Sequence, residues 1–385
     1  MPTIEPLSQV TYIPGDLSFE QNGIRLSTGL TSNIIATSGQ KVNLLGGKKS
    51  KEKFHFNPDG GAIFREPSGS GWVYVSNSEH ENGGVGAMYF NEQAQVTGYD
   101  FILKGTTRNC GGGKTPWGTW LSCEESEGGQ VWEVDPWSGH FHQTNIGDEV
   151  GDYYEAAAYD FREPANPKFF VTTDTSSGAV VRFVPDPAIV EEASKTGNFM
   201  NILKINSSDA SSRTYLVINP LTSTFHWSSN KEEGENSARL YFPYSEGIDV
   251  RDGMLYFTVK TLKLLFILDL DMGTYESSST ISGAFENQPD QITRILGQSN
   301  EESILYFCED GGSSCGVHGR DKSGQFFTIL ESIDYNTETT GLAFSPDKKH
   351  MYVSFQHNPG HIFDITREDG LPFDGATLDI KYHQI

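Results

Sequence analysis

The sequence predicts a single all-β domain over residues 1–385, folded as a propeller. Short runs of β-branched and aromatic residues recur from one end of the chain to the other, separated by turn residues such as Asp59-Gly60-Gly61. Long amphipathic helical patterns are nearly absent, which disfavours an alternating α/β fold. A chain of 385 residues with 41 glycines suits a closed architecture of many short strands better than a two-sheet sandwich.

The expected strands are continuous or alternating apolar runs of four to six residues. They lie at 72–75, 86–90, 119–123, 169–172, 180–184, 254–259, 264–268, 304–308, 351–355 and 361–365. The best helical pattern is the short stretch 187–195, with the sequence PAIVEEASK. We expect a polar insertion between blades at about 186–238.

The charge balance restricts the partners of this protein. Lys and Arg number 28 against 51 Asp and Glu, for a net charge of -23. Such a surface repels phosphate backbones and anionic lipid, so we expect no nucleic-acid binding and no membrane insertion. Divalent cations are natural partners, although the same acidity is also typical of a highly soluble protein or a salty habitat.

The four cysteines, Cys110, Cys123, Cys308 and Cys315, form no C-x-x-C pair, which disfavours a zinc ribbon. Whether Cys308 and Cys315 form a local disulfide stays open from their spacing. The N-terminal stretch MPTIEPLSQV has neither the basic nor the apolar region of a signal peptide. We therefore expect a cytoplasmic chain or a mature form whose signal has been removed.

A glutamate repeatedly adjoins an expected strand. The pattern is seen at Glu79 (VYVSNSE), Glu124 (TWLSCE) and Glu309 (ILYFCE), while Glu155 and Glu246 come just before a strand or turn. In a propeller, equivalent ends of the inner strands meet at one rim of the axis. Five carboxylates gathered there would repel one another unless cations bind between them, so the pattern predicts a metal site. The alternative is a set of solvated loop glutamates.

Residues 105–125, GTTRNCGGGKTPWGTWLSCEE, carry the densest chemistry. Three glycines after Asn109-Cys110 allow the backbone to approach a ligand closely. The thiol of Cys110 suits a transition metal and the nearby carboxylates suit calcium or ferric iron. Alternatively, Cys110 is a small buried apolar residue, as many free cysteines are. The glycines lack the spacing of a Walker loop.

The stretch NCGGGKTPWGTWLSCEE closely resembles the signature of the PhoX family of alkaline phosphatases. The resemblance continues in the family's order over roughly residues 59–365. It includes Asn77-Ser78-Glu79, Glu155-Ala156-Ala157-Ala158, Val181-Arg182-Phe183-Val184-Pro185, Glu246-Gly247-Ile248, Pro289-Asp290-Gln291, Cys308-Glu309-Asp310-Gly311 and the GLAFSPD stretch with Gln356.

The resemblance implies a propeller of about six blades with iron and calcium on its axis, in a secreted or periplasmic protein that hydrolyses phosphate monoesters. Cys110 is the implied iron ligand. The implied metal ligands are Glu79, Cys110, Glu124, Glu155, Glu246, Asp290 and Glu309. We expect the catalytic residues to be Asn109, Cys110, Glu155 and Glu246.

The chain departs from the family at several positions. Tyr244-Ser245-Glu246-Gly247 stands where the family has Arg-Pro-Glu-Gly, so a guanidinium that binds phosphate is lost. Tyr154 and Ser78 replace histidines, and Thr173-Asp174 replaces Glu-Asp. Arg108, Lys114 or Arg320 are the candidates to replace the lost guanidinium. We expect Arg108, Lys114 and Tyr244 to contact the substrate.

The sequence favours a metal-dependent hydrolase, first a phosphatase or phosphoesterase acting on a small anionic or ester substrate. A calcium-dependent lactonase or esterase and a non-catalytic, metal-stabilised binding propeller remain alternatives. No G-x-S-x-G elbow is present, which disfavours a serine hydrolase.

Overall fold

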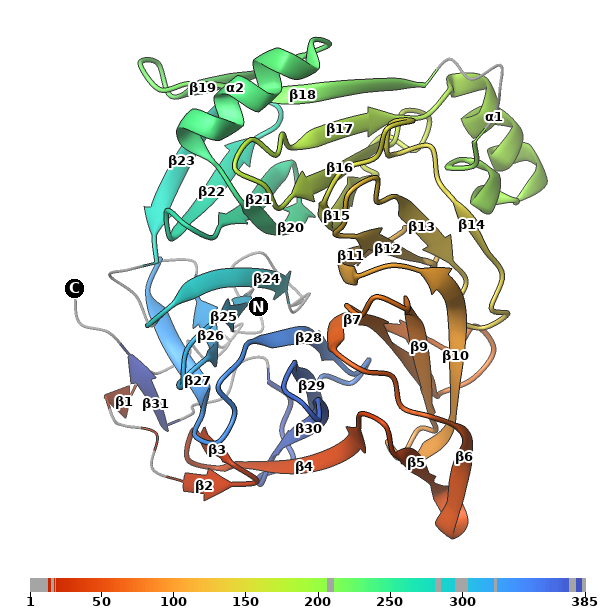
Figure 1. The fold of residues 1–385 in the computed structure, drawn as a ribbon, viewed down its shortest axis with the longest axis vertical. Helices are drawn as coiled ribbons and strands as arrows, with labels where there is room; N and C mark the ends of the chain where they lie inside the picture. The colour runs from red at the N-terminus through yellow and green to blue at the C-terminus, as the bar shows by residue number, and fades with distance from the viewer. Residues whose placement is uncertain are drawn as a thin grey trace, which may run out of the picture.

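The computed structural model describes residues 13–14, 17, 19–205, 211–280, 285–294, 304–321, 324–373 and 379–382. Antiparallel sheets are arranged around a central axis as the blades of a β-propeller (Figure 1). The predicted all-β propeller is therefore confirmed. The N-terminal residues 1–10 and residues 206–210 of the expected insertion lie outside the described part of the chain.

The strands group into six four-stranded units, which we number as blades 1 to 6 in chain order. The inner strands are β7 (Pro58–Arg65), β11 (Asn109–Lys114), β15 (Tyr154–Asp160), β20 (Ser245–Arg251), β24 (Gln288–Arg294) and β28 (Thr339–Phe344). The second strands are β8 (Trp72–Ser78), β12 (Trp120–Glu124), β16 (Lys168–Thr173), β21 (Met254–Val259), β25 (Leu305–Asp310) and β29 (His350–Phe355). The third strands are β9 (Gly83–Phe90), β13 (Val131–Val134), β17 (Val181–Val184), β22 (Leu264–Asp269), β26 (Gly316–Arg320) and β30 (His361–Arg367). The outer strands are β10 (Val96–Thr106), β14 (Phe141–Gln143), β18 (Ser212–Asn219), β23 (Thr274–Ser279), β27 (Phe326–Ser332) and β4 (Leu30–Thr37).

Blade 6 closes the ring, because its outer strand β4 comes from the N-terminal part of the chain and pairs with β30. The pairing brings Thr37 beside His361 and Leu30 beside Arg367. Closure of this kind joins the two ends of the chain and leaves the ring without a gap between its first and last blades.

Additional strands extend three blades. The strand β19 (Thr224–Ser228) pairs with both β18 and β23, and so joins blades 3 and 4 into one sheet. Blade 5 is extended by β3 (Ile24–Leu26) with β2 (Phe19–Gln21), and by β31 (Asp379–Tyr382) with β1 (Ile13–Pro14). A small hairpin of β5 (Lys41–Leu44) and β6 (Lys48–Lys53) follows β4.

The hydrophobic core lies between neighbouring blades. Val73 and Val75 of blade 1 belong to the same apolar cluster as Trp120 and Val134 of blade 2. Because each second strand is covered on both faces, it is apolar over most of its length, and all seven residues of β8 are buried. This double burial is why the strands were recognisable as continuous apolar runs.

The segment 186–238 contains the expected α-helix and a short 3-10 helix, η2 (Phe199–Asn201), and a second, unexpected α-helix begins within it. The helix α1 (Pro187–Thr196) begins after Asp186, whose carboxylate accepts a hydrogen bond from the Ala188 amide. The helix α2 (Lys231–Tyr241) was not predicted, because its sequence is polar and only small residues of it are buried. The strand β18 from the same segment is hydrogen-bonded to β17, so this part of the segment belongs to blade 3.

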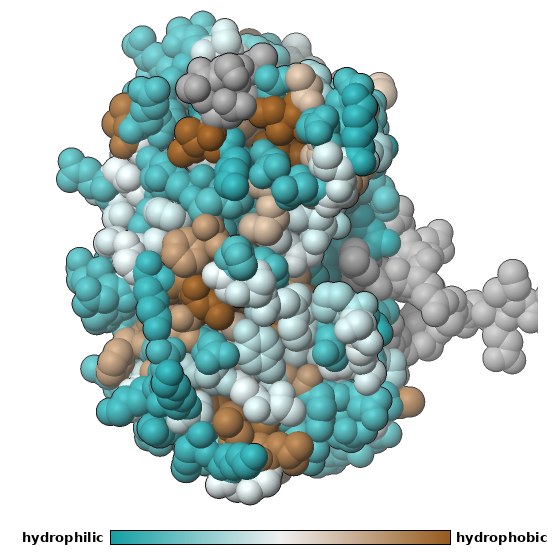
Figure 2. Space-filling model, turned by 90° about the vertical axis from the view of Figure 1, so that its right-hand side faces the viewer, coloured by the Kyte–Doolittle hydropathy of each residue, from teal (hydrophilic) through white to brown (hydrophobic). Residues whose placement is uncertain are grey.

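The side of the propeller drawn in Figure 2 is mostly hydrophilic, with small and separate apolar patches. This agrees with the net charge of -23. Within the described ranges, no helix is both long and apolar enough to span a bilayer.

Candidate metal centre

The same β-bulge recurs in every inner strand. The pairing between inner and second strands shifts register at Pro58/Gly61, Asn109/Gly112, Tyr154/Ala157, Ser245/Ile248, Pro289/Ile292 and Thr340/Ala343. A bulge leaves residues unpaired and turns a side chain away from its regular direction, which is why bulges are common beside functional sites. Six equivalent bulges therefore aim six positions toward the axis at one end of the propeller.

The first residue of each bulge is acidic or a thiol in five of the six blades. These residues are Asp59, Cys110, Glu155, Glu246 and Asp290, with Gly341 at the equivalent position of blade 6. In blade 6 the acidic residue is Glu338, which directly precedes the inner strand β28. We call this set the inner ring.

The backbone around Cys110 is held in place by small residues and by one buried amide. A Cβ at Gly111 would lie 2.5 Å from the carbonyl oxygen of Glu155, so only glycine permits β11 and β15 to approach this closely. The side-chain amide of Asn77 donates to the carbonyl oxygens of Cys110 (2.8 Å) and Gly111 (2.6 Å). Asn77 is fully buried and so fixes the direction of the Cys110 side chain.

A second set of residues, the outer ring, lies at the ends of the second strands. Glu79, Glu125, Asp174 and Lys260 directly follow β8, β12, β16 and β21, and Asp310 ends β25. In blade 6 the corresponding polar group is Gln356, directly after β29. The two rings meet at the same end of the propeller, because each second strand ends where its inner strand begins.

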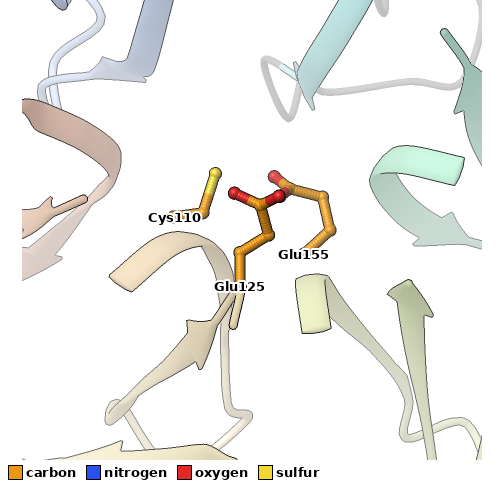
Figure 3. Close-up of side chains that lie close together, drawn as sticks. All are labelled: Cys110, Glu125 and Glu155. Atoms are coloured by element: carbon orange, nitrogen blue, oxygen red, sulfur yellow. The ribbon is translucent and has the colours of Figure 1, made fainter. Parts of the chain in front are cut away.

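The two rings form three groups whose ligand atoms all lie within 4.8 Å of one another. The groups are Cys110, Glu125 and Glu155; Asp59, Glu79 and Glu338; and Glu155, Glu246 and Asp290. The first group is drawn in Figure 3, where the thiol of Cys110 and both carboxylates point toward a common point from β11, the end of β12 and β15. Glu155 belongs to two of the groups and links them.

Burial and mutual repulsion shift the protonation of these groups. Burial, with the charge of Glu79, raises the pKa of Asp59 from 3.8 to about 7. Burial, with Glu79 and Asp174, raises the pKa of Glu125 to about 7. Burial first, and neighbouring carboxylates second, also raise the pKa values of Cys110, Glu155, Glu246, Asp290 and Glu338.

Among the described residues, two cationic side chains form ion pairs with the rings. Arg108 forms ion pairs with Glu79 and with Glu125, the latter at 3.2 Å. The ammonium of Lys260 lies 3.0 Å from a carboxylate oxygen of Glu246 and 2.9 Å from one of Asp310. Both cations are therefore already paired with carboxylates.

The residues of the inner ring fit metal ions. The Oε1 atom of Glu155 is buried and, within the described part of the chain, has no hydrogen-bond partner. An unpaired buried carboxylate oxygen is costly, and a cation beside it would remove that cost. The donor set is a thiol with carboxylates in the first group and carboxylates alone in the other two, which suits a transition metal in the first and a hard cation such as calcium in the others.

A channel of about 460 Å³ lies along the axis beside the bulges. It is lined by small residues of the inner strands, among them Gly60, Gly112, Ala156 and Gly247. Lys114 lines it as well, far along β11 from Cys110. The Lys114 ammonium donates to the carbonyl oxygen of Ile63 (2.7 Å) and lies over the Phe64 ring, so Lys114 is not brought to the acidic rings.

Of the residues predicted from the sequence, the structure brings Glu79, Cys110, Glu155, Glu246 and Asp290 into the groups. Arg108 borders them. Asn109 lies beside them in sequence, but its side chain is fully buried inside blade 2, where it accepts from Thr106 (2.6 Å) and donates to Ser122 (2.9 Å). The expected catalytic position of Asn109 thus finds no support in its contacts.

Glu124 and Glu309 are not brought into any of the three groups. The Glu124 carboxylate accepts from the Thr107 amide (2.8 Å), the Gln130 amide (3.0 Å) and the Trp132 indole (2.9 Å). The Glu309 carboxylate accepts in the same way from the Asn287 amide, the Gly316 amide and the His318 ring. Both side chains point into their blades, because neighbouring residues of a strand face opposite sides.

The sequence analysis predicted Glu124 and Glu309 as ligands. It missed the residue that follows each of them, Glu125 and Asp310, whose side chains reach the axis. It also missed Asp59, Glu338, Asp174 and Lys260. A usable signal was present: five of these residues flank the start of an inner strand or the end of a second strand. All four cysteines are free in the structure, including Cys308 and Cys315.

Comparison with known proteins finds a family match in the segment that supplies the first group of ligands. The model of the alkaline phosphatase PhoX family matches residues 86–160, which include Cys110, Glu125 and Glu155. No curated protein matches the chain. PhoX of Pseudomonas fluorescens, solved in complex with vanadate, a transition state analogue, superposes with a TM-score of 0.70 at 15% identity, covering 96% of this chain and 99% of that one.

Two other solved structures are less similar. A gluconolactonase of Xanthomonas campestris has a TM-score of 0.46 at 11% identity, over 94% of this chain and 99% of that one. An auxiliary nutrient binding protein of Bacteroides ovatus has a TM-score of 0.49 at 10% identity, over 88% of this chain and 76% of that one.

The family match falls on the blades that supply the thiol and two of the carboxylates, and the PhoX propeller covers nearly the whole chain. By this segment the chain is similar to the PhoX family, and by its fold it is similar to the PhoX propeller.

Proposed function

We propose that the protein is a metal-dependent hydrolase of the phosphatase type, with its active centre at the acidic rim of the propeller axis. The observation that carries the proposal is the convergence of Cys110, Glu125 and Glu155 on one point, from the segment that matches the family. In this proposal iron is held by Cys110, Glu125 and Glu155. Calcium is held by the carboxylate groups around Asp59 and Asp290.

A bound cation at this rim would supply Lewis acidity, drawing charge from the oxygens of a phosphate ester. The chain's own residues would hold and orient the reactants. Arg108 pairs with Glu79 and Glu125 and is partly exposed, so its guanidinium is the cationic group best placed to turn toward an anionic substrate. Asn77 fixes the Cys110 backbone, which keeps the thiol in position without taking part in the reaction.

A neutral ester or lactone is the second candidate substrate, and a specific observation favours it. Arg108 and Lys260, the two cations found at the rim among the described residues, are both engaged by carboxylates. The family arginine is replaced by Tyr244. A site with so little free positive charge would bind a neutral ester with less penalty than a phosphate dianion.

The test has two parts. Elemental analysis of protein purified without chelator should find iron and calcium in stoichiometric amounts, and Cys110→Ser should lose iron together with any visible charge-transfer absorption. Activity is then measured on a phosphate monoester and on a neutral lactone, with Glu246→Gln as the inactive control for either reaction.

Turnover of the phosphate monoester that is lost in Glu246→Gln supports the phosphatase. Turnover of the lactone alone assigns the site to the second candidate. Metal-loaded protein that hydrolyses neither substrate contradicts both and leaves a binding propeller. Folded protein that contains neither metal would overturn the proposed metal centre itself.

A further inference from the structure

Lys260 interrupts a repeated pattern of charge. The outer ring has a carboxylate after the second strand in blades 1, 2 and 3, and at the end of the second strand in blade 5. Blade 4 has Lys260 at the same place, directly after the last residue of β21, Val259. Val259 pairs with Ser245, the residue before the bulge residue Glu246. Relative to its neighbours, blade 4 therefore reverses the charge at this position.

The Lys260 ammonium contacts carboxylates of three blades. It lies 3.0 Å from Glu246 of its own blade, 3.5 Å from Asp174 of blade 3 and 2.9 Å from Asp310 of blade 5. The side chain of Glu246 is almost completely buried, with 2% of its surface exposed, whereas 23% of the Lys260 side chain is exposed. The ammonium thus stands at the boundary between the buried inner ring and solvent.

The contacts of the ammonium match its bonding capacity. An ammonium group has three N–H donors and no acceptor, and three carboxylates surround this one. An ammonium paired with three carboxylates is less available to a substrate anion.

We infer that Lys260 is a tethered cation that takes the place of a metal ion between Glu246, Asp174 and Asp310. Its single charge offsets part of the negative charge of these three carboxylates without an added ion, as Arg108 does for Glu125 in the group of Cys110 and for Glu79 in the group of Asp59. This goes beyond the proposed hydrolase activity, because it concerns how many ions the rim binds and not what reaction takes place there.

Removing the ammonium should open a site for one more ion. In Lys260→Met, three carboxylates would face one another without a counter-charge, and calcium is the hard cation that such oxygen donors bind. We expect the variant to bind about one more calcium ion per chain than the wild type, measured by equilibrium dialysis and elemental analysis. Its thermal midpoint should fall in chelator by more than that of the wild type, and calcium should restore it.

Three further variants make the test specific. Lys260→Gln is a second neutral variant. Its side-chain amide can still donate a hydrogen bond to a carboxylate, so it should fold even if Lys260→Met does not. Lys260→Arg keeps the charge and should bind the same number of ions as the wild type. Lys231→Met removes a lysine that lies 2.9 Å from Asp148 and 3.4 Å from Asp152, away from the axis, and should gain no ion.

If neither neutral variant gains calcium relative to the wild type, the inference is wrong. The same holds if Lys260→Arg or Lys231→Met gains an ion as well, because the effect would then not depend on the charge at this position. The comparison is independent of the proposed function. A wild type with no metal would contradict the proposed metal centre, and a gain in Lys260→Met would still support the tethered cation.

Discussion

The backbone amide of Lys260 donates a hydrogen bond to the carbonyl oxygen of Tyr244 over 3.0 Å. The residue that carries the ammonium therefore lies directly beside the position where the PhoX family has an arginine. Tyr244 itself is partly exposed and adopts a left-handed backbone conformation, with φ of 57°. At this edge of the rim the cation is therefore carried by Lys260, directly after β21, and not by residue 244.

Restoring the family residue should reveal the substrate class. Tyr244→Arg replaces one side chain with another of similar backbone requirements and adds a guanidinium at the rim. A charge-assisted hydrogen bond is worth roughly 1.5–3 kcal/mol, so a contact made in the transition state would raise kcat/KM for a phosphate monoester about tenfold or more. Turnover of a neutral lactone should not rise. Unchanged phosphate-ester activity with unchanged metal content would contradict a phosphate site at this position.

Two adjacent glutamates should behave differently when each is made neutral. Glu125→Gln should weaken metal binding but cause little loss of stability when both proteins are compared free of metal, because Glu125 belongs to the group of Cys110 and Glu155. Glu124→Gln should retain metal binding and lower the free energy of unfolding, because the Glu124 carboxylate accepts three hydrogen bonds inside blade 2. The net contribution of a hydrogen bond to a charged group is about 1.5–3 kcal/mol, after the hydrogen bonds to water that folding removes are taken into account. Titration with iron and urea denaturation distinguish the two, and the reverse result would place Glu124 at the axis.

Removing metal should destabilise the folded protein. The cations are expected to bind the native rings and not the unfolded chain, so at 100 times the dissociation constant each would add about 2.7 kcal/mol. Thermal melts in excess chelator should therefore show a lower midpoint, which added calcium reverses. A midpoint that is the same with and without chelator would mean that the acidic groups bind no ion under these conditions.

The metal-free protein should lose stability as the pH rises. Asp59 has a pKa of about 7 in the folded protein, against 3.8 for the ordinary side chain, because of burial and the charge of Glu79. Between these values the folded protein holds a proton that the unfolded chain has released. This contribution to the free energy of unfolding is fully present below about pH 4 and is lost as the pH rises through about 7.

Asp59→Asn provides the comparison for this pH dependence, since its side chain cannot ionise. The difference in unfolding free energy between wild type and variant, measured in chelator across this range, should change with pH in the stated direction. A difference that is constant with pH would show that Asp59 titrates normally.

Close packing of the inner strands makes one glycine irreplaceable. A Cβ at Gly113 would overlap the backbone carbonyl of Ala157 in the next blade. Because backbone cannot move aside as a side chain can, Gly113→Ala should cost at least the 1–3 kcal/mol typical of overpacking. Gly98→Ala is the matched control, because its Cβ would meet only the side chain of Tyr89 at 3.2 Å. Urea denaturation of both variants measures the difference, and equal stability would contradict the close approach of β11 and β15.

The strands and the propeller were predictable because their physics is local. Strands such as β21 (Met254–Val259) are covered by neighbouring blades on both faces and so show continuous apolar runs, and the prediction for 254–259 matches β21 at both ends. The helix α2 was not predicted because its buried residues are Gly234, Ser237 and Ala238. Small and polar residues at these positions do not produce the apolar periodicity by which a helix is recognised in a sequence. The residues of the inner ring were found in part because glycine follows Cys110 and Glu246 in recognisable motifs.

From the sequence alone came the all-β propeller, the family resemblance, and Glu79, Cys110, Glu155, Glu246 and Asp290 as residues of the rim. Only the tertiary structure decided between Glu124 and Glu125, and between Glu309 and Asp310. Two adjacent acidic residues cannot be distinguished by residue type. Which of the two side chains faces the axis depends on where the second strand ends. The tertiary structure also revealed the charge reversal at Lys260, because Asp174 and Asp310 lie 86 and 50 positions from it in sequence and meet it only when the ring of blades closes.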